Sequence, residues 1–187
     1  MTVVACKLLT YKGQYNTCQI KVPDVEVKLS AIEIDSQYYS LFRRFKDADT
    51  VVQALEKLSK HQGEVLALTR QKSNYTMWAL ELEALAFKGP RKQSHHAWPT
   101  HGPAKCLMLG DATQYQQCYV QVPELAEPII AVHHDNRFYS VYQPGLGAIA
   151  ALKLAAKFTR RGNESAIAAT AKGYAVCLWE PEATKNG

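Results

Sequence analysis

Two pairs of cysteines are the residues whose spacing comes closest to chemistry. Cys6 and Cys18 flank a predicted turn near residue 12, and Cys106 and Cys118 repeat the arrangement. Thiols that face each other across a hairpin could form a redox pair or bind a metal ion. The alternative, which we favour, is two small buried hydrophobic side chains, because cysteine metal ligands usually lie close together on one turn. Five cysteines are an odd number, so we expect free thiols, with Cys177 in the core.

Histidines offer a second candidate for a metal site. His95, His96 and His101 lie in a proline-rich stretch, and His133 and His134 adjoin a predicted turn. Imidazole is a common zinc ligand, and five of them would be enough for one ion. However, consecutive residues of a strand point to opposite faces, and histidines in a polar loop are usually solvated. We therefore predict no metal site.

The segment GLGAIA at 145–150 has the G-x-G-x-x-A form of a dinucleotide-binding loop, with Glu164 about 20 residues further on. Against this, the chain reads FKDADT at the matching positions 45–50, and the surrounding strands resemble hairpins, whereas a dinucleotide fold needs parallel strands. Close packing at a helix entry explains the glycines equally well. The sequence also lacks the nucleophile-elbow, P-loop and H-E-x-x-H motifs. It therefore predicts no cofactor and no catalytic residue.

Basic and aromatic residues mix at 38–46, around Trp98 and at 157–161. Proteins that bind single-stranded RNA use such mixtures, because bases stack on aromatic rings while Arg and Lys contact phosphates. Against this, Arg43 and Arg44 have no basic counterpart in the second half of the chain, and no RNP motif is present. Binding of RNA or single-stranded nucleic acid is therefore the alternative function and not the preferred one.

An internal repeat organises all of these residues, and it keeps one register for about sixty positions. The matches include Cys6/Cys106, Leu9/Leu109, Gln14/Gln114, Tyr15/Tyr115, Cys18/Cys118, Pro23/Pro123, Ala31/Ala131, Asp35/Asp135, Tyr39/Tyr139, Ser40/Ser140, Ala48/Ala148 and Lys57/Lys157. We therefore predict one copy at 1–88 and a second copy at 104–187. The connector between them, 89–103, is rich in proline, histidine and basic residues.

The residue patterns of the two copies predict the same order of secondary-structure elements. ACKLLT and YNTCQIKV flank a short loop around Gly13, which indicates a first hairpin. A second hairpin follows, with Asp35–Ser36 in one copy and Asp135–Asn136 in the other as two-residue turns of positive φ. Such a turn places Ile32 opposite Tyr39.

A helix comes next in each copy. Asp47 is a suitable N-cap, and the apolar stripe that follows consists of Val51, Ala54, Leu55 and Leu58. The helix of the second copy has further apolar residues, Ile149, Leu152 and Ala156, so we expect it at the seam between the copies. Two closing strands complete a β-β-β-β-α-β-β unit, an antiparallel sheet with one helix. The predicted fold is α+β, with two tandem copies packed as a pseudo-two-fold pair.

Composition and charge describe an ordinary globular chain. The 187 residues are 47% hydrophobic, and the formal charge of +5 divides into +2 for 1–88, +2 for 89–103 and +1 for 104–187. Neither copy is therefore a basic module. The sequence shows no signal peptide and no apolar run of about 18 residues, so we expect a cytoplasmic protein without a membrane span.

A duplicated small α+β protein without a catalytic constellation is best interpreted as a non-catalytic binding, adaptor or assembly protein. We therefore predict that it is not an enzyme and that it has a protein partner, with nucleic acid as the alternative. Aromatic and arginine side chains supply much of the energy at protein interfaces. The predicted contact surface consists of Phe138, Tyr142, Trp98, Trp179, Arg43, Arg44, Arg160 and Arg161.

Overall fold

The chain folds around one large β-sheet. The computed structural model describes residues 3–10, 12–23, 25–59, 65–87 and 103–185. These residues form an α+β fold, the predicted class, with 14 strands in one sheet and two α-helices. We call 3–87 the N-terminal segment and 103–185 the C-terminal segment. Neither helix in this described part of the chain has the length and apolar character that crossing a membrane requires.

The two segments contain similar series of elements. The N-terminal segment contains β1 (Val4–Leu9), the 3-10 helix η1 (Lys12–Gln14), β2 (Asn16–Lys21), β3 (Leu29–Ile34), β4 (Gln37–Phe45), α1 (Ala48–Ser59), β5 (Val65–Gln71), β6 (Asn74–Glu81) and β7 (Leu85–Ala86). The C-terminal segment contains β8 (Lys105–Leu109), η2 (Ala112–Gln114), β9 (Gln116–Gln121), β10 (Ile129–His134), β11 (Arg137–Leu146), α2 (Ala148–Arg160), β12 (Ser165–Thr170), β13 (Gly173–Trp179) and β14 (Thr184–Lys185).

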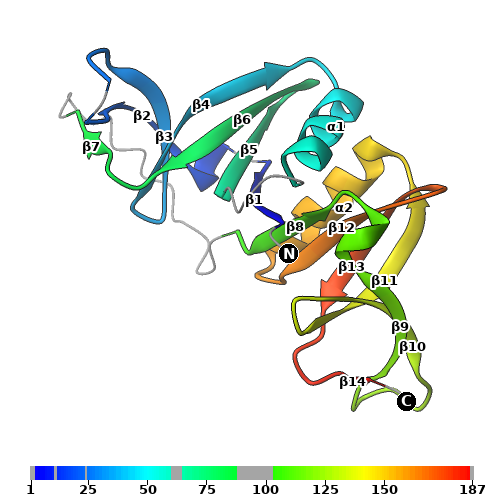
Figure 1. Cartoon of the computed structure of the whole chain (residues 1–187). Helices are drawn as coiled ribbons and strands as arrows, with labels where there is room; N and C mark the ends of the chain where they lie inside the picture. Colours follow the sequence, from blue (N-terminus) through cyan, green and yellow to red (C-terminus); the bar gives the residue numbers. More distant parts are fainter. Residues whose placement is uncertain (1–2, 11, 24, 60–64, 88–102, 186–187) are drawn as a thin grey trace.

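The strands lie in the order β14-β9-β10-β11-β13-β12-β8-β1-β5-β6-β4-β3-β2-β7 (Figure 1). Most neighbours are antiparallel, but β1 runs parallel to β5, and β8 runs parallel to β12. The prediction of a purely antiparallel sheet is therefore wrong. Parallel neighbours need a long crossover, and the chain between β1 and β5 supplies one that contains three strands and α1.

Strands β1 and β2 do not form the predicted hairpin. Strand β1 lies between β5 and β8, in the middle of the sheet, while β2 pairs with β3 and β7. Burial explains the difference, because Cys6 and Leu8 on one face of β1 and Leu9 next to them are all buried. A strand with apolar residues on both faces suits the centre of a sheet better than a hairpin with one solvated face. The predicted loop around Gly13 is occupied by η1.

The second predicted hairpin is confirmed in both segments. Ile32 lies opposite Tyr39 in the pair β3–β4, and Val132 lies opposite Tyr139 in β10–β11. The turn residues all have positive φ: 48° at Asp35, 63° at Ser36, 48° at Asp135 and 59° at Asn136. Asp and Asn adopt this conformation more readily than most residues, which is why the turn could be recognised in the sequence.

The two helices begin differently. Asp47 caps α1, as predicted, since its Oδ1 accepts hydrogen bonds from the Thr50 backbone N at 2.8 Å and from the Thr50 Oγ1 at 2.7 Å. These hydrogen bonds hold the pKa of Asp47 below its usual value. Gly147 occupies the same position before α2 and provides no side-chain cap. The entry to α2 therefore lacks one stabilising contact that α1 has.

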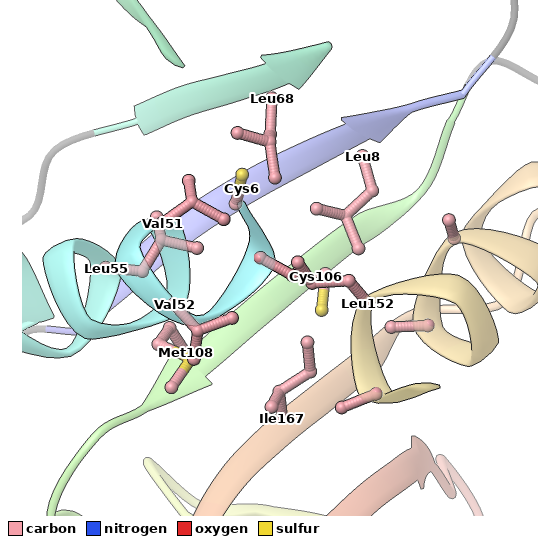
Figure 2. Close-up of a cluster of buried hydrophobic side chains, with 14 of the residues drawn as sticks. Cys6, Leu8, Val51, Val52, Leu55, Leu68, Cys106, Met108, Leu152 and Ile167 are labelled. Atoms are coloured by element: carbon pink, nitrogen blue, oxygen red, sulfur yellow. The ribbon is translucent and has the colours of Figure 1, made fainter. Parts of the chain in front are cut away.

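Both helices pack against the same face of the sheet and enclose one shared core (Figure 2). Its members include Cys6, Leu8, Val51, Val52, Leu55 and Leu68 from the N-terminal segment and Cys106, Met108, Leu152 and Ile167 from the C-terminal segment. Leu152 and Ala156 lie in this core, as predicted. The prediction for Ile149 is wrong: it is 50% exposed, because it lies on the solvent side of α2 with Lys153, four residues further on.

The other face of the sheet carries a separate apolar cluster in each segment. In the N-terminal segment the cluster surrounds Ile32 and Tyr39, and in the C-terminal segment it surrounds Val132 and Tyr139. No helical residue contributes to either cluster within the described ranges. Each cluster is therefore built mainly from one segment, although Val3 of the N-terminal segment packs against the C-terminal cluster, and the core on the helix face is shared.

Strands β1 and β8 join the two segments directly. They pair antiparallel, with Cys6 opposite Cys106 at the centre of the register. Polar contacts add to this pairing, since the Gln114 side-chain nitrogen donates to the Ser59 carbonyl oxygen at 2.7 Å. Gly110 lies so close to α1 that a Cβ atom there would be 2.7 Å from the Ser59 Oγ. The segments are therefore connected by backbone, polar and apolar contacts at once.

Candidate contact surfaces

The predicted contact residues do not lie in one patch. Arg43 and Arg44 are exposed on β4, whereas the other described members of the set lie on β11, on α2 or directly after it, and on β13. Six strands lie between β4 and β11, and the seven spacings of about 4.8 Å place the two strands roughly 34 Å apart along the sheet. Trp98 lies outside the described residues, so the structure does not test it.

Two of the predicted aromatic contacts are already used within the fold. The Trp179 ring lies under the guanidinium of Arg137, 5.0 Å from its centroid, and Arg137 also pairs with Glu164 at 2.9 Å. The Phe138 ring packs on the His133 ring, with 4.8 Å between their centroids. Both aromatic residues are half-buried. Each therefore has less free surface than the sequence suggested.

The thiols do not form the predicted pairs. Cys6 lies opposite Cys106 across the seam and not beside Cys18. Burial raises the pKa of Cys6 well above its ordinary value, and it raises the pKa of Cys106 and of Cys177 to about 12. Cys18 and Cys118 are half-buried, and burial raises their pKa as well. All five are free thiols, and raised pKa values make them poor nucleophiles and poor metal ligands.

The histidines next to the β10–β11 turn have structural contacts. His134 is buried, and its Nδ1 lies 2.6 Å from the Gln114 carbonyl oxygen. Within the described residues there is no group of three His, Cys, Asp or Glu side chains placed to hold a metal ion. His95, His96 and His101 lie outside those residues.

The segment GLGAIA is not placed as a dinucleotide-binding loop. It lies at the end of β11, which pairs antiparallel with β10 and β13, whereas a dinucleotide loop joins parallel strands. Gly173 explains the tight local packing, because a Cβ atom there would lie 2.6 Å from the Leu146 carbonyl oxygen. Gly145 has a φ of +70° within the irregular end of β11. The positive φ favours glycine at position 145, but the close packing expected at the helix entry is not found, because nothing lies within 4 Å of a Cβ atom placed at Gly145 or at Gly147.

The solvent face of α2 is basic. Lys153, Lys157 and Arg160 follow the spacing i, i+4, i+7, so they form one exposed stripe, which we call the α2 basic stripe. The helix contains no acidic residue. Lys153 and Lys157 have no ion-pair partner in the described part of the chain. Tyr142 lies beside this helix, exposed by 58% and in edge contact with Phe158 at 4.9 Å between ring centroids.

Sequence reasoning missed an exposed apolar pair on the sheet. Tyr119 on β9 lies opposite Ile130 on β10, and the two are 58% and 42% exposed. The N-terminal segment has Gln19 opposite Ser30 at the corresponding register. The alignment of the two predicted copies contained the signal, since Gln19 and Ser30 align with Tyr119 and Ile130.

Comparisons with protein-family models, with curated proteins and with solved structures found no match for this chain. The proposed function therefore rests on the exposed Tyr119–Ile130 pair and on the α2 basic stripe.

Proposed function

We propose that the protein is a non-catalytic binding protein that acts through protein–protein contacts, with Tyr119 and Ile130 at the centre of its contact surface. The observation that carries this proposal is their exposure on a regular, paired part of the sheet. Two residues further along the same face lies Val132, a member of the apolar cluster around Tyr139. The exposed pair thus lies beside this buried cluster, toward the edge of the sheet.

A protein partner suits this surface better than a small molecule. The pair is flat and exposed, and interfaces between proteins are centred on aromatic and aliphatic side chains that become buried on binding. Removing the exposed parts of Tyr119 and Ile130 from water would contribute about 2 kcal/mol to association. Of the predicted contact residues, Tyr142, Arg160 and Arg161 keep exposed surface on the helix side, and Arg43 and Arg44 on β4. We retain these as secondary contacts.

The proposal includes the architecture predicted from the repeat. Copies at 1–88 and 104–187, joined by the connector 89–103, would pack as a pseudo-two-fold pair. The similar order of elements supports this arrangement. The register supports it further, because Cys6 pairs with its own counterpart in the repeat, Cys106, as residues on a two-fold axis must. In this arrangement the Tyr119–Ile130 pair is present on one copy only.

Site-specific photo-crosslinking tests the proposed contact surface. Benzoylphenylalanine is placed at position 119, or at position 19 as the matched control, and the full chain is irradiated in the cells that produce it. We expect protein adducts from position 119 and only background from position 19, because Gln19 lies in the corresponding polar pair. Equal adducts at both positions, or adducts at 119 that disappear after nuclease treatment, would contradict the proposal.

Binding of single-stranded RNA is the second candidate, and the α2 basic stripe favours it. Lys and Arg in a row match the charge of a phosphate backbone, and such binding weakens steeply with salt. A mobility-shift assay with mixed-sequence RNA at low and at physiological salt tests it. A shift that falls with salt and is lost in a Lys153→Glu, Lys157→Glu variant would support RNA binding, and no shift at low salt would exclude it.

A further inference from the structure

A pocket lies between the two segments, on the helix face of the sheet. Its floor consists of Leu8, Leu68 and Leu152, each less than 5% exposed, and Thr10, Arg70 and Lys153 lie around it. The centre of a water-sized sphere can occupy about 20 Å³ within it, enough for about one water molecule, and the unoccupied space in and above the pocket, open solvent included, totals about 290 Å³. The pocket can therefore accept the end of one apolar side chain.

The pocket exists because the two helices meet the sheet differently. At the corresponding place on the other side of the seam, Gly110 of the C-terminal segment lets α1 of the N-terminal segment approach closely, and a Cβ atom there would be 2.8 Å from the Cα of Glu56. At the pocket, Thr10 stands where Gly110 would be, and Ala156 stands where Glu56 would be. The side chain of Ala156 is shorter than that of Glu56, and the space beside it is left unfilled. The site between Gly110 and α1 is therefore closely packed, whereas the site between Thr10 and α2 is left open.

Two cationic side chains border the pocket. Arg70 is held in place because its Nε donates to the Lys72 carbonyl oxygen at 2.9 Å and its guanidinium lies 5.8 Å from the centroid of the Tyr75 ring. Lys153 is exposed and belongs to the α2 basic stripe. Neither cation has an ion-pair partner in the ranges that the structure describes. The pocket therefore combines an apolar floor with uncompensated positive charge at its mouth.

We propose that this pocket and the α2 basic stripe bind an acidic segment of a partner protein, with one aliphatic side chain inserted between Leu8, Leu68 and Leu152. Carboxylates on either side of that side chain would meet Arg70, Lys153 and Lys157. A nucleic acid fits less well, because the floor is aliphatic and the one aromatic ring of the lining, Tyr75, is only 4% exposed and offers no face for a base to stack on. The inference rests on the proposed function of protein binding, but it uses a surface separate from Tyr119 and Ile130.

Fluorescence anisotropy with a defined probe tests the proposal. The probe is a fluorescein-labelled peptide in which one leucine is flanked by two glutamates on each side, and the reference peptide has serine in place of leucine. With the full chain we expect saturable binding of the leucine peptide and at least fivefold weaker binding of the serine peptide. No binding of either peptide, or equal binding of both, would overturn the proposal.

Variants of the protein distinguish binding at the pocket from nonspecific attraction between the acidic peptide and the basic protein. Lys153→Glu is expected to weaken binding of the leucine peptide at least tenfold, whereas Lys105→Glu, an exposed lysine on β8, should change it less than twofold. Ala156→Glu would place in the pocket the residue that α1 has at the corresponding position, and it should abolish the preference for leucine over serine. Equal losses in the Lys153→Glu and Lys105→Glu variants would contradict a local site, whether or not Ala156→Glu folds.

Two further arms distinguish this inference from its alternatives. A Tyr119→Ser, Ile130→Ser variant should bind the leucine peptide as the parent does, so loss of the proposed sheet surface leaves the pocket intact. If the peptide does not bind but position 119 gives protein adducts, the pocket proposal is contradicted and the proposed function of protein binding is not. A single-stranded RNA oligonucleotide is used as competitor, and displacement of the peptide at a lower concentration than unlabelled leucine peptide requires would assign the surface to nucleic acid and contradict the proposal.

Discussion

The cysteines of this protein act as small apolar side chains. Cys6 and Cys106 lie in the shared core, and Cys177 lies in the cluster on the other face of the sheet. Burial raises their pKa and disfavours the thiolate, which is the reactive form, so we expect these three thiols to contribute mainly to packing.

Thiol labelling of the native protein tests this assignment. At about pH 8 we expect an aromatic disulfide reagent to label Cys18 and Cys118 first, because they are only half-buried. Cys6, Cys106 and Cys177 should react only after unfolding. Mass spectrometry of the labelled peptides identifies the sites, and rapid labelling of Cys6 or Cys106 would contradict their burial.

Gly110→Ala is expected to destabilise the protein by about 1–3 kcal/mol. The added methyl group would lie 2.7 Å from the Ser59 Oγ and 2.8 Å from the Cα of Glu56, and a backbone atom cannot move aside cheaply. Gly13→Ala is the control, since nothing lies within 4 Å of its Cβ position. Urea denaturation measures both, and equal stability of the two variants would show that the contact between Gly110 and α1 is looser than described.

The conformation or contact of a single residue could be predicted where it depends on residues nearby in the sequence. The positive φ at Asp35 and Asp135 and the cap at Asp47 follow from neighbours in the sequence. The need for glycine at position 110 could not be predicted, because Ser59 and Glu56 reach it from the other segment. The Tyr119–Ile130 pair could have been found by comparing the two copies at each register, as could the substitution of Ala156 for Glu56 that opens the pocket.

At the level of elements, the caps distinguish the two helices. Asp47→Ala should lower the urea midpoint at neutral pH, because the Thr50 backbone N–H loses its acceptor at the start of α1. The pKa of Asp47 is lowered in the folded state, so its contribution is present above the unfolded value of 3.8 and is lost as the pH falls below it. The difference between the parent and the alanine variant should therefore shrink in acid.

Asp47→Asn is the matched control for this effect. Asparagine is also a good N-cap, so the variant should keep most of the stability at neutral pH and lose the dependence on pH. A difference between the parent and Asp47→Ala that stays constant from neutral to strongly acidic pH would contradict a role for the charged cap.

Elements formed by neighbouring residues could be predicted, and elements formed by distant ones could not. The β3–β4 and β10–β11 hairpins follow from their two-residue turns. Strand β1 was assigned to the wrong neighbour, because its true partners, β5 and β8, are about 60 and 100 residues away in the chain. The sequence contained one sign of a central strand. Val4, Cys6 and Leu8 put apolar side chains on one face of β1, and Leu9 puts another on the opposite face.

At the scale of the whole molecule, the shared core makes the two segments depend on each other. Leu152→Asp would place a charge among Leu8, Leu68 and the other residues of that core, so we expect a loss of more than about 3 kcal/mol. Ile149→Asp, on the solvent side of the same helix, should cost less than about 1 kcal/mol. Urea unfolding followed by tryptophan fluorescence compares the two, and similar losses would argue against α2 as a seam helix.

The central claim is that the two segments form one body, joined by the β1–β8 pairing and by the core that both helices enclose. The proposed pocket depends on it, since its lining contains residues of both segments. Scanning calorimetry of the full chain tests it most directly. We predict one transition, with a ratio of calorimetric to van't Hoff enthalpy of about one. Two resolved transitions, or a ratio of about two, would show that the segments unfold independently and would contradict the account.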